Sequence, residues 1–335
     1  MSHCFIPNGY KSILTTYQTQ SAIGRLKRVF EDNLSMALNL HRVSAPLFVE
    51  PQTGLNDNLS GVERPVEFDI PETGSTAQIV HSLAKWKRLA LHKYGFTAGE
   101  GLYTDMNAIR REEIMDNTHS IYVDQWDWEI VISQEERNED FLKQTVNRIV
   151  EAIYTTSERL RWDFPALPVS IKRDVTFITS QELEDLYPKL TPEEREAEFT
   201  KEHKTVFIMK VGGKLKSGKR HGSRAPDYDD WSLNGDILLW HDILGCAIEI
   251  SSMGIRVDAA VLDAQLKEAV CDDRRNLSFH KALLAGELPL TMGGGIGQSR
   301  LCMLLMAKAH IGEVQVSVWD SQTVKACKTA GVKLL

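Results

Sequence analysis

Residues 236–252 read DILLWHDILGCAIEISS, two runs of strand-forming residues with a short turn between them. The runs predict strands at Asp236–Trp240 and Ala247–Ser252. The connection is too short for a crossover helix, so the two strands should pair antiparallel. A second pair is predicted at Gly101–Ile109 and His119–Ile130, joined by a charged loop. Adjacent strands of this kind indicate an α+β fold with a mainly antiparallel sheet, not a doubly wound parallel one.

The remaining elements follow from local patterns. Further strands are predicted at Val43–Val49, Val175–Ile178, Thr205–Val211 and Val314–Trp319. Four side chains are suited to begin helices: Ser82, Ser133, Thr179 and Thr191. Gly95 should end the first of these helices. Another helix is predicted from about Ile296 to His310, directly after a run of glycines.

Composition excludes several classes of protein. The 335 residues carry 39 Lys and Arg against 46 Asp and Glu, a net charge of −7, which disfavours a dedicated nucleic-acid-binding protein. The longest apolar run, residues 301–307, is too short to span a membrane. The five cysteines are scattered and odd in number, which favours reduced thiols and a cytoplasmic protein. No repeat or linker marks a domain boundary.

Two glycine-rich stretches resemble nucleotide-binding motifs without matching them. Residues 213–219 fit a P-loop, but Arg220 replaces the Ser or Thr that would bind Mg²⁺, and Pro226 excludes the required helix. We therefore predict a basic surface turn there. Residues 293–297 fail the dinucleotide spacing. Their glycines still allow a ligand close to the backbone, and Arg300 lies in the first turn of the following helix, so an anion or nucleotide site is predicted. The alternative is a glycine-rich loop that packs against a neighbouring element.

Carboxylates on the first strand pair suggest a metal site. Strict alternation places Ala247, Glu249 and Ser251 on one face of their strand. A glutamate in mid-strand is unfavourable unless its face is wet, paired or metal-bound. Asp236 begins the partner strand, and two carboxylates suit Mg²⁺. The segment alone leaves open the alternative of an exposed sheet face with a surface ion pair.

The second strand pair has one polar face. Because side chains alternate along a strand, Gln125, Asp127 and Glu129 should lie on one face, with two tryptophans on the opposite face. Arg110 ends the preceding strand, and a planar, permanently charged guanidinium suits a phosphate. The acidic residues at 227–230 would alone be interpreted as a turn. Their convergence with the glycines, the arginines and the carboxylate pair favours an active site.

Seven blocks of sequence carry a family resemblance: Val80–Arg88, Gly99–Tyr103, Tyr122–Glu129, Arg224–Trp231, Leu233–Leu238, Ser251–Asp258 and Gly293–Leu301. They resemble the ammonia-dependent asparagine synthetases, or aspartate–ammonia ligases, from about residue 11 to the C-terminus. The resemblance implies one catalytic domain over residues 1–335, with residues 1–10 as a flexible extension. It leaves no room for an appended tRNA-binding module.

That family in turn resembles the class II aminoacyl-tRNA synthetases, aspartyl-tRNA synthetase above all. Val43–Pro46 is similar to motif 1 at the dimer interface, Arg110–Glu112 to motif 2, and Gly295–Leu301 to motif 3. The resemblance implies an antiparallel sheet flanked by helices, in a homodimer. One departure is the single residue between Trp231 and Leu233, where the family pattern is longer. We expect a trimmed loop there and a less ordered segment at 227–230.

The resemblance also implies a two-step reaction. The β-carboxylate of L-aspartate attacks the α-phosphorus of ATP, and ammonia then attacks the β-aspartyl-adenylate to give L-asparagine. The implied ATP-binding residues are Arg110, Glu112, Gly295, Gly297 and Arg300, with Mg²⁺ on Asp236 and Glu249. The implied aspartate-binding residues are Lys87, Asp127, Asp229, Ser251, Ser252 and Arg256. Asp57 and Gln125 are expected to guide ammonia or accept its proton.

Three alternatives frame this expectation. A glutaminase would need a nucleophilic cysteine, commonly N-terminal after Met removal, but residue 2 is Ser and Cys4 belongs to no such pattern, so no glutaminase partner is expected. A tRNA synthetase would need an anticodon-binding domain and a basic RNA face. A catalytically inactive binding module would have lost the phosphate and metal ligands, whereas Arg110 and Arg300 are present.

Overall fold

An eight-stranded sheet forms the centre of the computed structural model, which describes residues 4–335. In spatial order its strands are β1 (Leu40–Arg42), β5 (Gly101–Ile109), β6 (Tyr122–Val131), β11 (Thr291–Gly297), β10 (Cys246–Arg256), β9 (Asp229–His241), β8 (Thr205–Met209) and β7 (Thr176–Thr179). The neighbours from β5 to β8 pair antiparallel, and only the edge strands β1 and β7 pair parallel. Both predicted strand pairs, β5–β6 and β9–β10, are confirmed.

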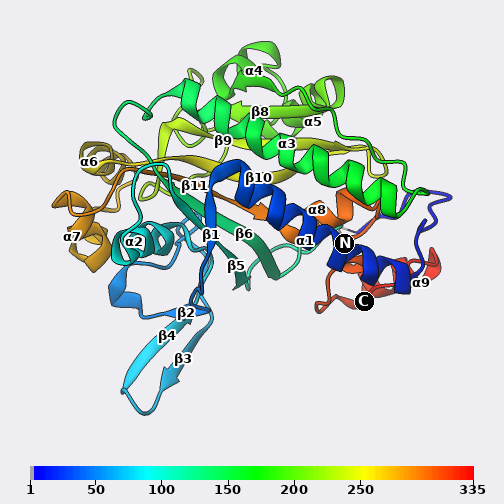
Figure 1. The fold of residues 1–335 in the computed structure, drawn as a ribbon, viewed down its shortest axis with the longest axis horizontal. Helices are drawn as coiled ribbons and strands as arrows, with labels where there is room; N and C mark the ends of the chain where they lie inside the picture. The colour runs from blue at the N-terminus through cyan, green and yellow to red at the C-terminus, as the bar shows by residue number, and fades with distance from the viewer. Residues whose placement is uncertain (1–3) are drawn as a thin grey trace.

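Two long helices, α1 (Thr16–Leu38) and α3 (Glu139–Asp163), lie side by side across one face of this sheet (Figure 1). Apolar residues at helical spacing point from them into the core, which receives the fully buried Trp126 and Trp128 from β6. The Phe30 and Trp126 rings pack with centroids 4.6 Å apart. Burying each large apolar side chain contributes about 1.5–3 kcal/mol, so this layer anchors the strands that carry the polar residues on the opposite face.

The opposite face is covered only in part. Helices α2 (Ala84–Tyr94), α6 (Ala259–Glu268) and α7 (Ser278–Leu284) gather at one side, and α4 (Ser180–Leu186) with α5 (Pro192–His203) at the other (Figure 1). Each group has its own apolar cluster, the first around Leu83 and Leu262 and the second around Leu183 and Leu238. A small sheet, β2 (Phe48–Val49), β4 (Ser75–Ile79) and β3 (Glu67–Ile70), extends away from the body.

Helix α8 (Gln298–Leu305) is followed along the chain by the last helix, α9 (Ser321–Thr329). The described N-terminal segment packs against α9, because Cys4, Cys327 and Val332 share one buried cluster. Hydrogen bonds attach the N-terminal segment, because the Phe5 amide donates to Asn117 at 2.9 Å and the Tyr10 hydroxyl donates to Glu313 at 3.0 Å. Residues 1–3 of the predicted extension, including Ser2, lie outside the described residues. Within residues 4–335, no helix is long and apolar enough to cross a membrane.

Several local predictions are confirmed. Helix α2 ends at Gly95, which has φ 75°, and Thr179 and Thr191 form the expected capping boxes at α4 and α5. The stretch at 213–219 is a turn closed by a bridge between Lys214 and Arg220.

Three other predictions are wrong. Helix α3 begins at Glu139 with Asn138 as its cap, because the chain turns after Ser133 before it becomes helical. Residues 314–319 form no strand, since an apolar run needs a neighbouring strand to complete its hydrogen bonds. The helix predicted to reach His310 is only α8, which is followed by Ala307 with φ 52°.

Candidate active site

A cavity of about 350 Å³ opens on the partly covered face of the sheet. Strands β6, β10 and β11 form its floor, and helices α2 and α8 with residues 223–229 form its walls. Twelve of the predicted site residues line it: Asp57, Lys87, Arg110, Gln125, Asp127, Asp229, Glu249, Ser252, Arg256, Gly295, Gly297 and Arg300. Three do not line it, namely Glu112, Asp236 and Ser251. The volume suits a small-molecule ligand.

The glycine-rich stretch is a strand in the floor, not the loop predicted from its composition. In the ladder, Gly295 lies opposite Asp127 on β6 and Ser252 on β10, and Ser252 lies opposite Asp236 on β9. A Cβ atom on Gly293 would overlap the Glu129 carboxylate, and one on Gly295 would overlap the Gln125 side chain. The missing side chains therefore let charged groups of the neighbouring strands lean across β11.

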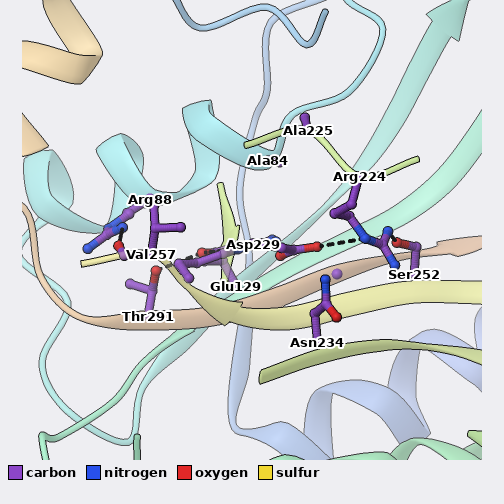
Figure 2. A network of polar contacts seen from close by, with 12 residues as sticks. Ala84, Arg88, Glu129, Arg224, Ala225, Asp229, Asn234, Ser252, Val257 and Thr291 are labelled. Carbon is purple, nitrogen blue, oxygen red and sulfur yellow. Dashed lines mark hydrogen bonds and ion pairs between the residues drawn. The ribbon is translucent and has the colours of Figure 1, made fainter. Parts of the chain in front are cut away.

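A buried ion cluster closes one end of the cavity (Figure 2). The Arg256 guanidinium donates to Glu129 at 2.7 and 2.9 Å and to the Asp229 carboxylate, and the Thr291 hydroxyl donates to Glu129 at 2.8 Å. Arg256 is 3% exposed and Glu129 is fully buried. Burial alone would raise the pKa of Glu129, but the adjacent Arg256 outweighs it and holds the pKa below its ordinary value.

Lys87 and Asp127 extend this ion cluster toward the ligand space. Lys87 Nζ donates to Asp127 Oδ1 at 2.5 Å and to the Gly294 carbonyl at 2.8 Å. Burial lowers the pKa of Lys87, and the carboxylates of Asp127 and Glu129 oppose that change. The other oxygen, Asp127 Oδ2, is buried and has no hydrogen-bond partner among residues 4–335. Because an unsatisfied buried acceptor is costly, this oxygen is suited to receive a hydrogen bond from a ligand.

Arg224 is a site residue that our sequence analysis did not assign. Its guanidinium donates to Asp236 at 2.5 Å and to the Ser252 hydroxyl, and lies 3.6 Å from Asp229 (Figure 2). It comes from an irregular segment between β8 and β9, so no periodicity indicates its direction. The Gly222-Ser223 pair before it was the available signal for a turn.

The predicted metal carboxylates lie on neighbouring strands. The pKa of Asp236 is raised to about 7, because burial and, to a smaller extent, nearby Glu249 raise it more than Arg224 lowers it. Glu249 is exposed and lines the cavity, whereas Asp236 lies behind the lining residues, held by Arg224. Two carboxylates on neighbouring strands are a donor set that fits a hard divalent cation.

A β-bulge decides which serine reaches the cavity. The pairing of β9 with β10 shifts between Glu249 and Ser251, which breaks the alternation predicted from the sequence. Ser252 therefore lines the cavity with Glu249. Ser251 is buried, and its hydroxyl has no hydrogen-bond partner among the described residues.

Two arginines mark the other end of the cavity. Arg110 Nη2 donates to the His81 carbonyl at 3.3 Å, and Arg300 donates to the carbonyls of Glu249 at 3.0 Å and Thr118 at 3.4 Å. Within residues 4–335, neither forms an ion pair with a carboxylate. Their charge is therefore available to an anionic ligand. Glu112, by contrast, is exposed and pairs with Arg64 at 2.6 Å.

Asp57 enters the cavity from the segment between β2 and β3. Its carboxylate accepts hydrogen bonds from the Ser82 hydroxyl and the Leu59 amide, both at 2.8 Å, and is 4% exposed. Ser82 thus binds Asp57, and α2 begins two residues later at Ala84. Asp57 and Gln125, the two residues expected to handle ammonia, line the same cavity as Arg110.

The segment at 227–230 is buried and paired, contrary to our expectation of a less ordered loop. Its carboxylates bind cations from elsewhere in the chain: Asp227 with Lys85 and Arg274, Asp229 with Arg256, and Asp230 with Arg137. Asp227 also forms a hydrogen bond with the His280 ring at 2.9 Å. These cations outweigh the effect of burial and lower the pKa of Asp227. The trimmed loop expected between Trp231 and Leu233 is also wrong, because both residues lie within β9.

Comparisons with known proteins identify similar sequences along the whole chain. A family model described as aspartate–ammonia ligase matches residues 17–331. An aspartate–ammonia ligase of Ruminiclostridium cellulolyticum is 56% identical over 336 residues, which cover 100% of both chains. The enzyme of that name from Lactobacillus johnsonii is 57% identical over 332 residues, 98% of this chain and 99% of that one.

Solved structures share the fold at low sequence identity. The asparaginyl-tRNA synthetase of Entamoeba histolytica, in complex with asparaginyl-adenylate, has a TM-score of 0.64 and 14% identity and covers 90% of this chain. The Pyrococcus horikoshii enzyme, complexed with asparaginyl-adenylate, has a TM-score of 0.62 and 15% identity and covers 88%. This chain spans 66% and 68% of those two chains. The predicted class II synthetase-like fold is confirmed.

Proposed function

This chain belongs to the aspartate–ammonia ligase family, and from that premise we propose that its cavity makes L-asparagine through a β-aspartyl-adenylate. L-aspartate, ammonia and ATP are the substrates, and AMP and pyrophosphate leave with the product. The observation that carries the proposal is the separation of charge along the cavity. One end holds arginines without carboxylate partners among the described residues, and the other holds a buried ion cluster with one open carboxylate oxygen.

The buried end suits the α-groups of aspartate. Asp127 Oδ2, which lacks a partner among the described residues, would accept a hydrogen bond from the α-ammonium group. Lys87 and Arg256 would hold the α-carboxylate, with Ser252 and Asp229 beside it. Ser251, predicted as a direct ligand, is buried behind the cavity floor and would not contact the substrate itself. With both α-groups held here, only the β-carboxylate is left to extend toward the phosphates.

The open end suits the nucleotide. Attack on the α-phosphorus builds negative charge on its oxygens, and rigid cations stabilise that charge most when they are already in place. Arg110 would contact the α-phosphate and Arg300 the distal phosphates or adenine, above the bare backbone of Gly295 and Gly297. Glu112 would need to leave Arg64 to reach the nucleotide.

Asp236 and Glu249 would hold Mg²⁺. Their mutual repulsion, evident in the raised pKa of Asp236, is relieved by a cation between them. When bound, Mg²⁺ neutralises the leaving pyrophosphate. Arg224 meanwhile fixes Asp236 through its hydrogen bond and positions Ser252 in the same row.

The second step needs ammonia rather than ammonium at the acyl carbon. Asp57 and Gln125 line the cavity and would orient ammonium and accept its proton. The carboxylate of Asp57 already accepts two hydrogen bonds, which fixes its direction before substrate arrives.

The test is AMP release by the purified protein with each substrate omitted in turn. We expect AMP and asparagine only when aspartate, ATP and ammonium are all present, with glutamine a poor nitrogen source. Pyrophosphate exchange with aspartate but no asparagine would indicate a tRNA synthetase instead. Absence of any aspartate-dependent turnover would indicate a binding module, and a clear glutamine preference would contradict the ammonia site.

We also propose that the protein is a cytoplasmic homodimer that contacts its partner around residues 43–46. Leu47 and Phe48, directly after this segment, are large apolar side chains with exposures of 51% and 44%. Such exposure on neighbouring residues suits an interface. Sedimentation equilibrium should give a dimer mass, and a Leu47→Glu variant should shift it toward the monomer. A monomer at all concentrations would contradict the proposal.

A further inference from the structure

The N-terminal segment and helix α9 meet at a pair of cysteines that do not line the cavity. Cys4, Cys327 of helix α9 and Val332 form a small buried cluster. A groove of about 760 Å³ runs along it, lined by residues 4–11 and by the facing side of α9. Cys4 is among the groove residues, whereas Cys327 is 1% exposed and is not. One thiol is therefore reachable from solvent and the other lies behind it.

His310 completes the cluster. One ring nitrogen of His310 and the sulfur atoms of Cys4 and Cys327 all lie within 4.8 Å of one another, and all three residues are buried. Two cysteines and a histidine suggest a zinc site at first inspection. The histidine argues against it. Its Nδ1 accepts a hydrogen bond from the Gly312 amide at 3.0 Å, so the proton of a neutral ring is on Nε2. Neither nitrogen then offers a free lone pair to a metal, and a metal-bound histidine ordinarily donates through its second nitrogen.

The same arrangement suits thiol oxidation. A hydrogen bond from Cys327, helped by His310, lowers the pKa of the Cys4 thiol to about 5, against the effect of burial. The same contact raises the pKa of Cys327. Cys4 lines the groove and is the cysteine that a peroxide can reach, and the enclosed Cys327 sulfur lies within 4.8 Å of the Cys4 sulfur. A thiolate is the nucleophile toward peroxides, and a neighbouring thiol resolves the sulfenic acid that forms.

We propose that Cys4 and Cys327 are a peroxide-oxidised pair that forms a reversible disulfide between the two ends of the chain. The Cys4 thiolate attacks a peroxide oxygen, which yields Cys4 sulfenic acid and, with one proton, water or an alcohol. The Cys327 sulfur then attacks the Cys4 sulfur and loses its proton, and hydroxide leaves as water. Two thiols are oxidised and one peroxide is reduced, so electrons and atoms balance. The pair acts independently of the ligase reaction.

The disulfide would tie α9 to the segment next to Phe5, whose amide donates to the Asn117 side chain at 2.9 Å, beside the cavity-lining Thr118. The Ile311 amide donates to the Asn117 carbonyl at 2.7 Å, and Ile311 and Thr118 both line the cavity near Arg300. The Leu335 amide donates to the Gly312 carbonyl at 2.8 Å. Oxidation would therefore restrain the residues that support the open end of the cavity, Thr118 and Ile311.

The experiment exposes the reduced full-length protein to hydrogen peroxide and maps its peptides without reduction. We expect a Cys4–Cys327 crosslink that dithiothreitol reverses. In Cys327→Ser, Cys4 should accumulate as a sulfenic acid that dimedone traps, and in Cys4→Ser, Cys327 should stay reduced. Cys271→Ser is the matched control, because Cys271 lies in another cluster and should leave the crosslink unchanged. Near-wild-type circular dichroism of each variant excludes unfolding.

Three results would overturn the proposal. One is oxidation of Cys271 or Cys246 ahead of Cys4. Another is a trapped Cys4 sulfenic acid in the unmodified protein that never proceeds to the disulfide. The third is one equivalent of zinc in protein purified without chelator and lost in Cys4→Ser, which would make the cluster a metal site.

Discussion

The two ends of the cavity handle charge in opposite ways. At the buried end, Arg256 and Lys87 are neutralised by carboxylates that are themselves enclosed. At the open end, Arg110 and Arg300 contact only backbone carbonyls among the described residues. The cations of the first end are neutralised before any ligand arrives, although Asp127 Oδ2 is still open there, whereas the cations of the second end have no carboxylate partner among the described residues. Substitutions at the buried end should therefore affect folding first, and those at the open end should affect catalysis first.

The largest expected effect is on stability at the buried end. Glu129→Gln keeps the shape of the side chain but leaves Arg256 and Lys87 with too little negative charge, which should cost about 3–5 kcal/mol. Urea unfolding measures the change. Glu268→Gln is the control, because its pair with Arg220 is partly exposed and should matter by less than about 1 kcal/mol. Equal effects of the two substitutions would erase the contrast between buried and exposed pairs.

The second effect is on turnover at the open end. Arg110→Ala should lower kcat/KM by about 10²–10³-fold, roughly 3 kcal/mol of transition-state stabilisation, with unfolding free energy changed by less than about 1 kcal/mol. Arg111→Ala is the matched control, since its neighbouring guanidinium is 46% exposed and does not line the cavity. Near-wild-type turnover of Arg110→Ala would remove this residue from the phosphate end.

The third effect concerns the glycine floor. Gly293→Ala would place a methyl group against the Glu129 carboxylate and the Arg256 guanidinium, and the strain should cost about 1–3 kcal/mol. Gly213→Ala is the control, because a Cβ atom there meets no other atom within 4 Å. Chemical denaturation compares them. If Gly293→Ala leaves the unfolding free energy unchanged, the buried ion cluster can accommodate a methyl group.

The fourth effect is a pH dependence at Asp236. Its pKa rises from 3.8 to about 7 on folding, so its favourable contribution is complete below pH 3.8 and is lost as pH rises through 7. Mg²⁺ needs the carboxylate, so its affinity should increase up to about tenfold per pH unit toward pH 7 and level off above it. Titration calorimetry at several pH values measures this. Asp236→Asn should remove both trends, and a pH-independent affinity would contradict the metal assignment.

Residues whose environment depends on near neighbours were predictable. Alternation in β6 correctly separated Trp126 and Trp128 from Gln125, Asp127 and Glu129, because strand side chains alternate whatever lies beside them. Capping boxes at Thr179 and Thr191 were predictable for the same reason.

Residues placed by distant contacts were not predictable in this way. β11 reads as a loop because glycine disfavours strands, and it becomes a strand only between β6 and β10. Val314–Trp319 reads as a strand but finds no partner among the described strands. The capping pattern at Ser133 is equally ambiguous, because Glu136 accepts a hydrogen bond from the Ser133 amide although the helix starts only at Glu139.

The amino-acid pattern alone was therefore sufficient for the antiparallel strand pairs, the polar and apolar faces of β6, and the arginines at 110 and 300 as candidate anion ligands. Each depends on spacing along one segment. Tertiary structure was needed to choose Ser252 over Ser251, to bring Arg224 between Asp229 and Asp236, and to join Cys4 to Cys327. These depend on strand register and on contacts between segments far apart in sequence. The spacing of residues within one segment does not reveal such contacts.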